Sequence, residues 1–266
     1  MSFLLDVIKN RNLIIGLSIS DFKKKFAGSF FGVIWMFVQP MATVLVYTLI
    51  FQVGFRAVPP VPNVPYVVWL IAGIVPWFYF QETIIQNTNC LIEYNYLVKK
   101  VVFNVSFLPI TKLISTTLSH FCFLIITFFV MIVFGIEVTP HWFLVFYYSF
   151  MLCILMLGIS YIVSSINVYF RDMGQIVSIL LQFGIWMCPI MYDESLFIGR
   201  DLLIIKFFKL NPLYCIITGY RYSLIGQKLN YDFLILSLYY IIVSILILFF
   251  GFKLFNKLKE QFADVI

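Results

Sequence analysis

Two stripes of polar and aromatic side chains are the part of this sequence that could bind a ligand. In each stripe the side chains recur at every third or fourth residue within an apolar segment. This spacing keeps them on one slowly drifting face of a helix. The first stripe consists of Trp35, Gln39, Thr43, Tyr47 and Phe51, and the second of Gln175, Ser178, Gln182 and Trp186.

Amides beside aromatic rings suit a carbohydrate ligand. The rings can stack on the C–H faces of a sugar, while amides and hydroxyls donate and accept hydrogen bonds with its hydroxyl groups. The same residue types also join membrane helices, through close packing and hydrogen bonds between neighbours. The residues alone leave open whether the stripes line a path or only hold helices together.

Motifs of catalysis are absent from the sequence. The chain lacks the GxxxxGK[ST] phosphate loop of an ATPase, the HExxH zinc motif and the GxSxG nucleophile motif. We therefore expect no catalytic residue, cofactor or metal site in this chain, and any energy for transport must enter through a partner. An enzyme working at the membrane surface would have to use Glu137, His141, Asp193 and Glu194.

The segments that carry the stripes are long and apolar enough to cross a membrane. Hydrophobic residues make up 62% and charged residues 11% of the chain, against about 25% charged in a soluble domain. A helix needs about 20 apolar residues to cross a hydrocarbon core. The sequence predicts an all-α integral membrane protein with one six-span domain over residues 30–266. The expected spans are residues 30–55, 66–86, 109–135, 142–169, 176–191 and 231–255.

The fifth segment and the stretch after it are less regular. Residues 176–191 are short for a straight span, and Pro189 predicts a broken or re-entrant segment. The outer region at residues 192–231 mixes charges with the apolar runs 202–210 and 213–217. We expect these runs to form short helices that dip back toward the membrane.

Basic residues predict the orientation of the chain. They precede the first span, follow the last, and lie in the second and fourth loops. Such residues mark cytoplasmic loops, so we expect both termini in the cytoplasm and do not read the net charge of +6 as nucleic-acid binding. The residues concerned are Lys9, Arg11, Lys23, Lys24, Lys25, Lys99, Lys100, Arg171, Lys253, Lys257 and Lys259.

Residues 1–29 predict an amphipathic helix in the cytoplasmic interface, with its apolar face in lipid and its cations toward headgroups. A helix packed only on protein is the alternative. Ionisable groups inside the spans are scarce, the main ones being Glu82, Lys112 and His120. We expect Glu82 and Lys112 to extend toward the cytoplasmic surface and His120 to be a packing residue. An ion-driven transporter would keep carboxylates near the midplane of the membrane.

Five short motifs stand in order along the chain. They are Ser29-x-x-Gly32-x-x-Trp35-x-x-x-Gln39-Pro40; Leu91-x₅-Leu97-Val98-Lys99-Lys100-Val101 with Phe107-Leu108-Pro109; Tyr169-Phe170-Arg171-Asp172-Met173; Cys188-Pro189-Ile190-Met191-Tyr192 with Leu210-Asn211-Pro212-Leu213; and the ending Phe262-Ala263-Asp264-Val265-Ile266. Together they resemble the permease subunits of type-2 ABC exporters for polysaccharides and polyol-phosphate polymers. One departure is Phe103-Asn104, where the family has phenylalanine–proline.

The resemblance implies a permease homodimer in the cytoplasmic (inner) membrane of a bacterium. Two copies of an ABC ATPase subunit, which hold ATP and magnesium, would dock beneath it, and a lipid-linked glycan would pass between the permease copies. It also implies a cytoplasmic coupling helix at about residues 89–102 and a turn at Arg171 and Asp172. The coupling residues would be Leu91, Glu93, Tyr94, Leu97, Lys99 and Lys100. As a hypothesis, Arg11, Lys23, Lys24 and Lys25 attract the headgroup of the lipid-linked substrate and anionic lipid.

The cargo stays open at this point. An O-antigen or capsule-like glycan is the main interpretation, and teichoic acid is an alternative that keeps the mechanism. A permease for drugs or small molecules would have a narrower pocket. The aromatic and amide stripes favour a glycan over that possibility.

Overall fold

The computed structural model describes residues 2–27, 30–99, 103–193, 202–229 and 232–265, and the regular elements within them are helical. They are α1 (Ser2–Lys9), α2 (Arg11–Phe26), η1 (Gly32–Ile34), α3 (Trp35–Thr48), the π-helical turn η2 (Leu49–Gly54), α4 (Tyr66–Glu93), α5 (Asn95–Val98), α6 (Phe107–Val133), η3 (Pro140–Phe143), α7 (Leu144–Tyr169), α8 (Met173–Met187), α9 (Leu202–Leu210), α10 (Pro212–Ile225), α11 (Phe233–Leu258), η5 (Lys259–Gln261) and α12 (Phe262–Val265).

Five helical runs within the described residues are long and apolar enough to cross a membrane: Gly32–Gly54, Tyr66–Glu93, Phe107–Val133, Pro140–Tyr169 and Phe233–Val265. The expected fifth span is short, as predicted, and its helix α8 (Met173–Met187) begins and ends a few residues before the predicted bounds 176–191. Its helix α8 has 15 residues, which rise about 22 Å and fall short of a core about 30 Å thick. Helix α8 stops because Cys188 takes an extended conformation directly before Pro189.

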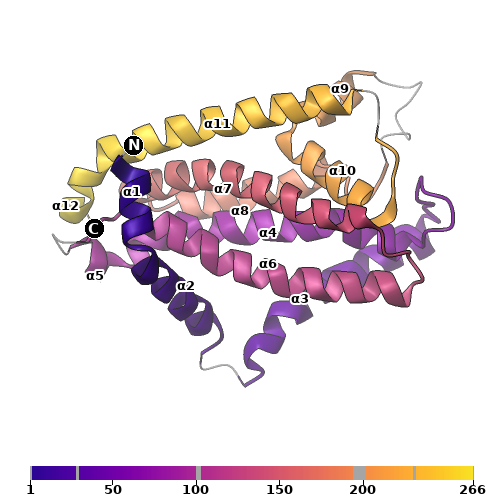
Figure 1. The fold of residues 1–266 in the computed structure, drawn as a ribbon, viewed down its shortest axis with the longest axis horizontal. Coiled ribbons are helices and arrows are strands. Elements are labelled where there is room, and N and C mark those ends of the chain that lie inside the picture. Colours follow the sequence, from indigo (N-terminus) through magenta and orange to yellow (C-terminus); the bar gives the residue numbers. More distant parts are fainter. Residues whose placement is uncertain (1, 28–29, 100–102, 194–201, 230–231, 266) are drawn as a thin grey trace.

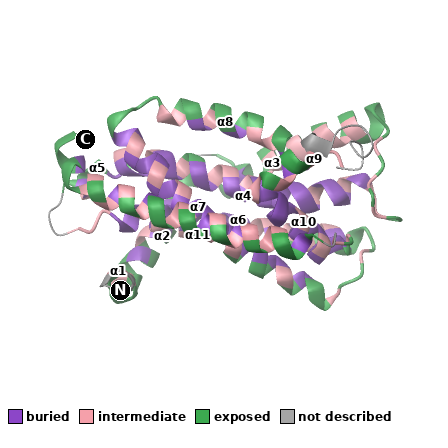
Figure 2. Ribbon diagram, turned by 90° about the horizontal axis from the view of Figure 1, so that it is seen from above, coloured by how far each residue is buried: buried purple, intermediate pink, exposed green. Residues whose placement is uncertain are grey.

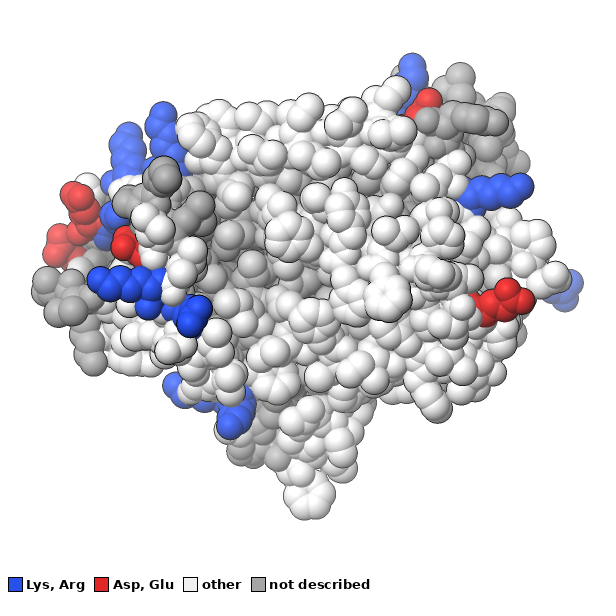
Figure 3. Space-filling model, viewed as in Figure 1, with Lys and Arg blue, Asp and Glu red and all other residues white. Residues whose placement is uncertain are grey.

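The long helices run side by side along the long axis of the molecule, and both termini lie at the same end (Figure 1). On the face shown in Figure 3, Lys, Arg, Asp and Glu gather toward the two ends, and a broad band between them carries no charge. This distribution matches a membrane core between two aqueous surfaces. We call the end with the termini, α5 and α12 the terminal end, and the end with α9 and α10 the far end.

Helix α4 is the centre of the bundle. It packs against α6, α7, α8 and α10, and 72% of its most apolar 18-residue stretch is buried inside the protein. Figure 2 shows α4 and α7 largely buried and α8 largely exposed along one side. The helix backbones of α7 and α11 approach closely at two glycines: a Cβ on Gly158 would lie 2.6 Å from the backbone nitrogen of Leu248, and one on Gly251 2.3 Å from the carbonyl oxygen of Gly158. Small residues allow such an approach between membrane helices.

The N-terminal region forms two helices where a single one was predicted over residues 1–29. Asn10 separates them with a non-helical backbone conformation, at a φ of −97° and a ψ of 16°, and its side-chain amide donates to the carbonyl oxygen of Asp6 at 2.9 Å. Helix α2 packs on α6 and buries Ile14, Ser18 and Asp21. Leu13, Ile15 and Ile19 of the same helix are exposed.

The short helices expected at residues 202–210 and 213–217 are present as α9 and α10, of which α10 is the longer. The boundaries of α10 follow from local chemistry. The side chain of Asn211 accepts a hydrogen bond from the backbone N–H of Leu213 at 3.0 Å, Pro212 occupies the first turn, and Gly226 ends the helix with a φ of +66°. Glu194, one of the residues considered for an enzyme at the membrane surface, lies outside the described residues.

Candidate functional site

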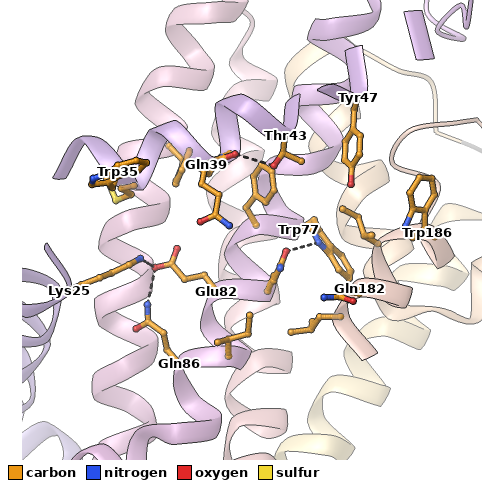
Figure 4. Close-up of a pocket in the computed structure, with 18 of the residues that line it drawn as sticks. Lys25, Trp35, Gln39, Thr43, Tyr47, Trp77, Glu82, Gln86, Gln182 and Trp186 are labelled. Atoms are coloured by element: carbon orange, nitrogen blue, oxygen red, sulfur yellow. Dashed lines mark hydrogen bonds and ion pairs between the residues drawn. The ribbon is translucent and has the colours of Figure 1, made fainter. Parts of the chain in front are cut away.

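A cavity of about 830 Å³ lies between α3, α4 and α8, with Lys25 of α2 at one end and Phe123 of α6 on its wall. Polar and aromatic side chains line it together. Figure 4 shows Lys25, Glu82 and Gln86 toward one side of the cavity and Tyr47 and Trp186 toward the other. Its lining combines ring faces with amide groups, the pairing that the sequence suggested for a sugar ligand.

The cavity brings together most of the two predicted stripes. Six of their members line it: Trp35, Gln39, Thr43, Tyr47, Gln182 and Trp186. The two stripes meet at Tyr47 and Trp186, whose ring centroids are 6.2 Å apart. Phe51 does not line the cavity but packs beside it, with its ring 6.5 Å from that of Trp186.

Gln175 and Ser178 are not among the lining residues. They lie one to two turns before Gln182 on α8, and the hydroxyl of Ser178 donates to the carbonyl oxygen of Gly174 at 2.8 Å. Only the second half of the α8 stripe therefore reaches the cavity.

Helix α4 supplies a wall that the sequence analysis missed. Trp77 and Gln81 line the cavity, and the indole N–H of Trp77 donates to the side-chain oxygen of Gln81 at 3.1 Å. Gly184 of α8 makes room for this indole, since a Cβ there would lie 2.8 Å from the Trp77 ring. The four-residue spacing of Trp77 and Gln81, and of Glu82 and Gln86, was the signal that could have predicted this wall.

An ion pair lies at one end of the cavity. The ammonium group of Lys25 pairs with the Oε1 atom of Glu82, and the amide of Gln86 donates to the same oxygen at 3.0 Å. Of the four residues expected to attract headgroups, Lys25 lines the cavity. Lys23 and Lys24 are exposed at the end of α2, and Arg11 is exposed at its start.

The turn after α8 is held by the side chains of Arg221 and Asn211. Arg221 of α10 is 3% exposed and donates to the carbonyl oxygens of Pro189 and Ile190, at 2.8 and 2.6 Å. Its guanidinium lies 3.6 Å from the ring centroid of Trp69. The Asn211 amide contacts the Cys188 sulfur at 3.1 Å, so the two parts of the fourth motif meet in space. The sequence analysis did not anticipate the role of Arg221.

His120 is a hydrogen-bonded packing residue, as expected. Its Nε2 atom lies 3.2 Å from the Ser149 hydroxyl and 3.0 Å from the Tyr220 hydroxyl. Its ring stacks on that of Tyr79, with centroids 4.2 Å apart and planes 6° from parallel. These contacts join α4, α6, α7 and α10 at the middle of the bundle.

Comparison with known proteins agrees with this architecture. The model of the ABC-2 type transporter family matches residues 13–225. The chain belongs to the ABC-2 type transporter family. Two similar proteins are both named O-antigen export system permease protein RfbA. That of Myxococcus xanthus is 30% identical over 271 residues, covering 98% of each chain. That of Klebsiella pneumoniae is 28% identical over 256 residues, covering 96% of this chain and 95% of the relative.

The family assignment confirms the predicted resemblance, and with the five apolar helices it makes the chain a multi-pass membrane permease. Its relatives are transport subunits by name.

The expected coupling segment of this ABC-2 permease is not one separate helix. Residues 89–93 are the last turn of α4, and α5 spans only Asn95–Val98. Leu91 and Tyr94 are buried among Phe255, Phe262 and their neighbours, and Leu97 packs on the same cluster. Lys99 is exposed, and Lys100 lies outside the described residues. Burial of Phe262 gives the C-terminal motif a structural role.

A buried charge cluster ties this segment to α2 and α6. The Lys112 ammonium lies 2.8 Å from Asp21 and 2.7 Å from Glu93, and the Tyr94 hydroxyl donates to Asp21 at 2.6 Å. The expectation that Lys112 extends to the surface is wrong, since its side chain is 7% exposed. A buried ammonium is stable only beside compensating charge, and Asp21 and Glu93 supply it. Burial and the hydrogen bond to Asp21 raise the pKa of the Tyr94 hydroxyl, which stays a donor.

The fourth loop of the permease, between α7 and α8, carries the third motif. Arg171 and Asp172 are exposed, and the side chain of Asp172 makes no capping hydrogen bond to α8. The carbonyl oxygen of Asp172 accepts from the backbone N–H groups of Gln175 and Ile176, at 3.0 and 3.1 Å. A carboxylate at this position also interacts favourably with the positive end of the dipole of α8.

Proposed function

We propose that this permease is the membrane subunit of an ATP-driven exporter that moves a lipid-linked polysaccharide, of O-antigen or capsule type, across the cytoplasmic membrane. The observation that carries the proposal is the convergence of the α3 and α8 stripes on one cavity lined by rings and amides. Full-length similarity to proteins named as O-antigen export permeases supports the choice of cargo.

The working unit is a homodimer, with the path between its two copies. Helices α3 and α8 and the turn η2 carry large apolar side chains on the side away from the bundle, among them Leu45, Leu49, Leu180 and Phe183, each more than half exposed. Only 6% of the most apolar 18-residue stretch of Gly32–Gly54 is buried by the rest of the chain. A second copy that packs against these faces would enclose the cavity and complete the walls of the path.

The terminal end faces the cytoplasm, and two ABC ATPase subunits dock there. Basic residues of the N-terminus, of the second and fourth loops and of the C-terminus support this orientation. Helix α5 and Lys99 form the docking surface, which includes Tyr96, a residue 48% exposed that the sequence analysis did not select. ATP and magnesium belong to the ATPase partner, whose closure would move the permease halves.

Helix α2 lies at the cytoplasmic interface and borders the entry to the path. Its exposed apolar residues, Leu13, Ile15 and Ile19, face lipid, while Asp21 anchors it to α6. Arg11, Lys23, Lys24 and Lys25 attract anionic lipid and the anionic headgroup of the substrate. Neutralising the three lysines should reduce transport more than membrane insertion, and equal loss of both would contradict this role.

The proposal is tested by deleting the gene and locating the glycan by fractionation and periodate-sensitive staining. We expect full-length, lipid-linked polymer on the cytoplasmic face and none at the surface, with recovery on complementation. A trapped polyol-phosphate polymer would change the cargo to teichoic acid and keep the mechanism. Normal surface polymer, in a strain shown to hold no second exporter, would reject glycan export and direct the next assays to drugs and other small molecules.

A further inference from the structure

The ion pair between Lys25 and Glu82 marks a binding site that is filled by the chain's own carboxylate. We propose that the Glu82 carboxylate occupies the position that an anionic headgroup takes when the substrate binds. Lys25 and Gln86 form the site that receives the diphosphate of the lipid-linked substrate when Glu82 is displaced. This inference deepens the proposed function and rests on it for the identity of the headgroup.

The first support is the position of the pair. Lys25 lies in the last turn of α2, Glu82 lies within α4, and both line the same cavity as the ring and amide side chains of α3 and α8 (Figure 4). In the proposed orientation this is the cytoplasmic end of the cavity. A headgroup bound here would leave its attached sugars beside the rings and amides, and its lipid tail beside the exposed apolar residues of α3.

The second support is the chemistry of the three side chains. The Lys25 ammonium and the Gln86 amide both donate toward Glu82 Oε1, so two donors from different helices converge on one anionic oxygen. A diphosphate presents several such oxygens and a larger negative charge than a carboxylate. Lys23 and Lys24, exposed beside Lys25, favour the more highly charged anion.

The third support is the limited burial of the pair. The Lys25 and Glu82 side chains are 33% and 22% exposed, whereas the Lys112 and Asp21 side chains are 7% and 8% exposed. A partly exposed ion pair contributes little net stability, so an anion that binds Lys25 more strongly can replace Glu82. Asp21, one helical turn earlier, keeps α2 attached to α6, so displacement releases only the last turn of α2 from α4.

Binding to the purified permease–ATPase complex in neutral-lipid nanodiscs tests the inference. The probes are farnesyl diphosphate, farnesyl monophosphate, farnesol and inorganic diphosphate. For farnesyl diphosphate we expect Glu82→Gln to lower the Kd at least fivefold and Lys25→Gln to raise it at least fivefold. Glu137→Gln, which removes an exposed carboxylate outside the cavity, is the matched control and should leave the Kd unchanged. Equal affinity of wild type and Glu82→Gln would overturn the inference.

The panel of probes also identifies what the site recognises. Tighter binding of farnesyl diphosphate than of the other three probes would support a site for a lipid diphosphate. If inorganic diphosphate bound equally well, the lipid part of the inference would be rejected. If farnesol bound equally well, the headgroup site itself would be rejected.

The two tests separate this inference from the proposed function. If the deletion strain traps glycan but Glu82→Gln leaves the affinity for farnesyl diphosphate unchanged, polysaccharide export is supported and the headgroup site at Lys25 and Gln86 is rejected. If the diphosphate binding pattern holds but surface glycan is normal, the headgroup site stands and the polysaccharide cargo is rejected.

Discussion

Lys112 and Asp21, 91 residues apart in the chain, meet inside the protein with the lysine Nζ atom 2.8 Å from the aspartate Oδ1 atom. The pair joins α2 to α6, and Glu93 adds the end of α4 to the same contact. Because Glu93 and Tyr94 directly precede α5, the proposed ATPase docking surface is mechanically linked to the N-terminal helix. A movement of α5 would therefore be transmitted to α2 through charged side chains.

Removing the cation of this cluster should destabilise the permease. Lys112→Met leaves Asp21 buried without its charge partner, which costs about 3–5 kcal/mol. We expect a lower yield of folded protein and faster proteolysis of α2 in the purified complex. The double variant Asp21→Asn with Lys112→Met should recover part of the loss, and a double variant as unstable as the single one would argue against pairing as the cause.

Tyr94→Phe tests the hydrogen bond in the same cluster without removing the ring. Loss of the donor to a buried carboxylate should lower stability by about 1–3 kcal/mol near neutral pH. Because the folded state raises the pKa of this hydroxyl, the unfolded chain loses the proton first as pH rises above the usual value of 10. Stability should therefore fall with pH in that range in the wild type, and the Tyr94 part of this fall should vanish in Tyr94→Phe. Thermal unfolding across pH measures both effects.

Amide groups of the cavity should contribute to transport and not to folding. Gln39→Ala and Gln182→Ala each remove donors and acceptors from the lining, and a lost hydrogen bond of about 1 kcal/mol corresponds to a decrease of about fivefold in export. Gln175→Ala is the matched control, since Gln175 lies on α8 outside the cavity. Surface glycan is measured at equal membrane levels of each variant. An equal loss of export in Gln175→Ala would show that the effect does not depend on the cavity.

Arg221 should be required for the turn after α8. Arg221→Lys supplies a single compact ammonium in place of the planar group that donates to Pro189 and Ile190, and a carbonyl left without its donor costs about 1–3 kcal/mol. We expect reduced thermal stability and weaker export. Lys228→Met, at an exposed cation in the loop after α10, should change neither. Wild-type behaviour of Arg221→Lys would show that the two hydrogen bonds are dispensable.

The contact between α7 and α11 should tolerate no side chain at its closest point. Gly251→Ala would bring a Cβ to 2.3 Å from a backbone oxygen, so the helices must separate at a cost of about 1–3 kcal/mol. Gly16→Ala in α2, where no atom lies within 4 Å, should be neutral or stabilising. Unfolding temperatures of the two variants in the same detergent compare the sites, and equal temperatures would contradict the close approach.

Features that depend on local sequence were predicted well. Long apolar runs require helices wherever lipid cannot satisfy the backbone, so five of the six expected spans correspond to helices of sufficient length. The short fifth segment, the irregular stretch after it and the helical runs 202–210 and 213–217 also followed from length, proline and hydropathy. The motifs predicted the family, which the match over residues 13–225 confirms.

Contacts between distant segments were decided only by the tertiary structure. Four-residue spacing placed Gln39 and Gln182 on faces of their helices, but the rotation and crossing of α3 and α8 determined that both faces meet one cavity while Gln175 stays outside it. Lys112 illustrates the same limit. Its position near a helix end suggested an exposed ammonium, and only the docking of α2 on α6 places Asp21 within reach. Helical periodicity specifies which side chains share a face, whereas packing against a neighbour specifies what that face contacts.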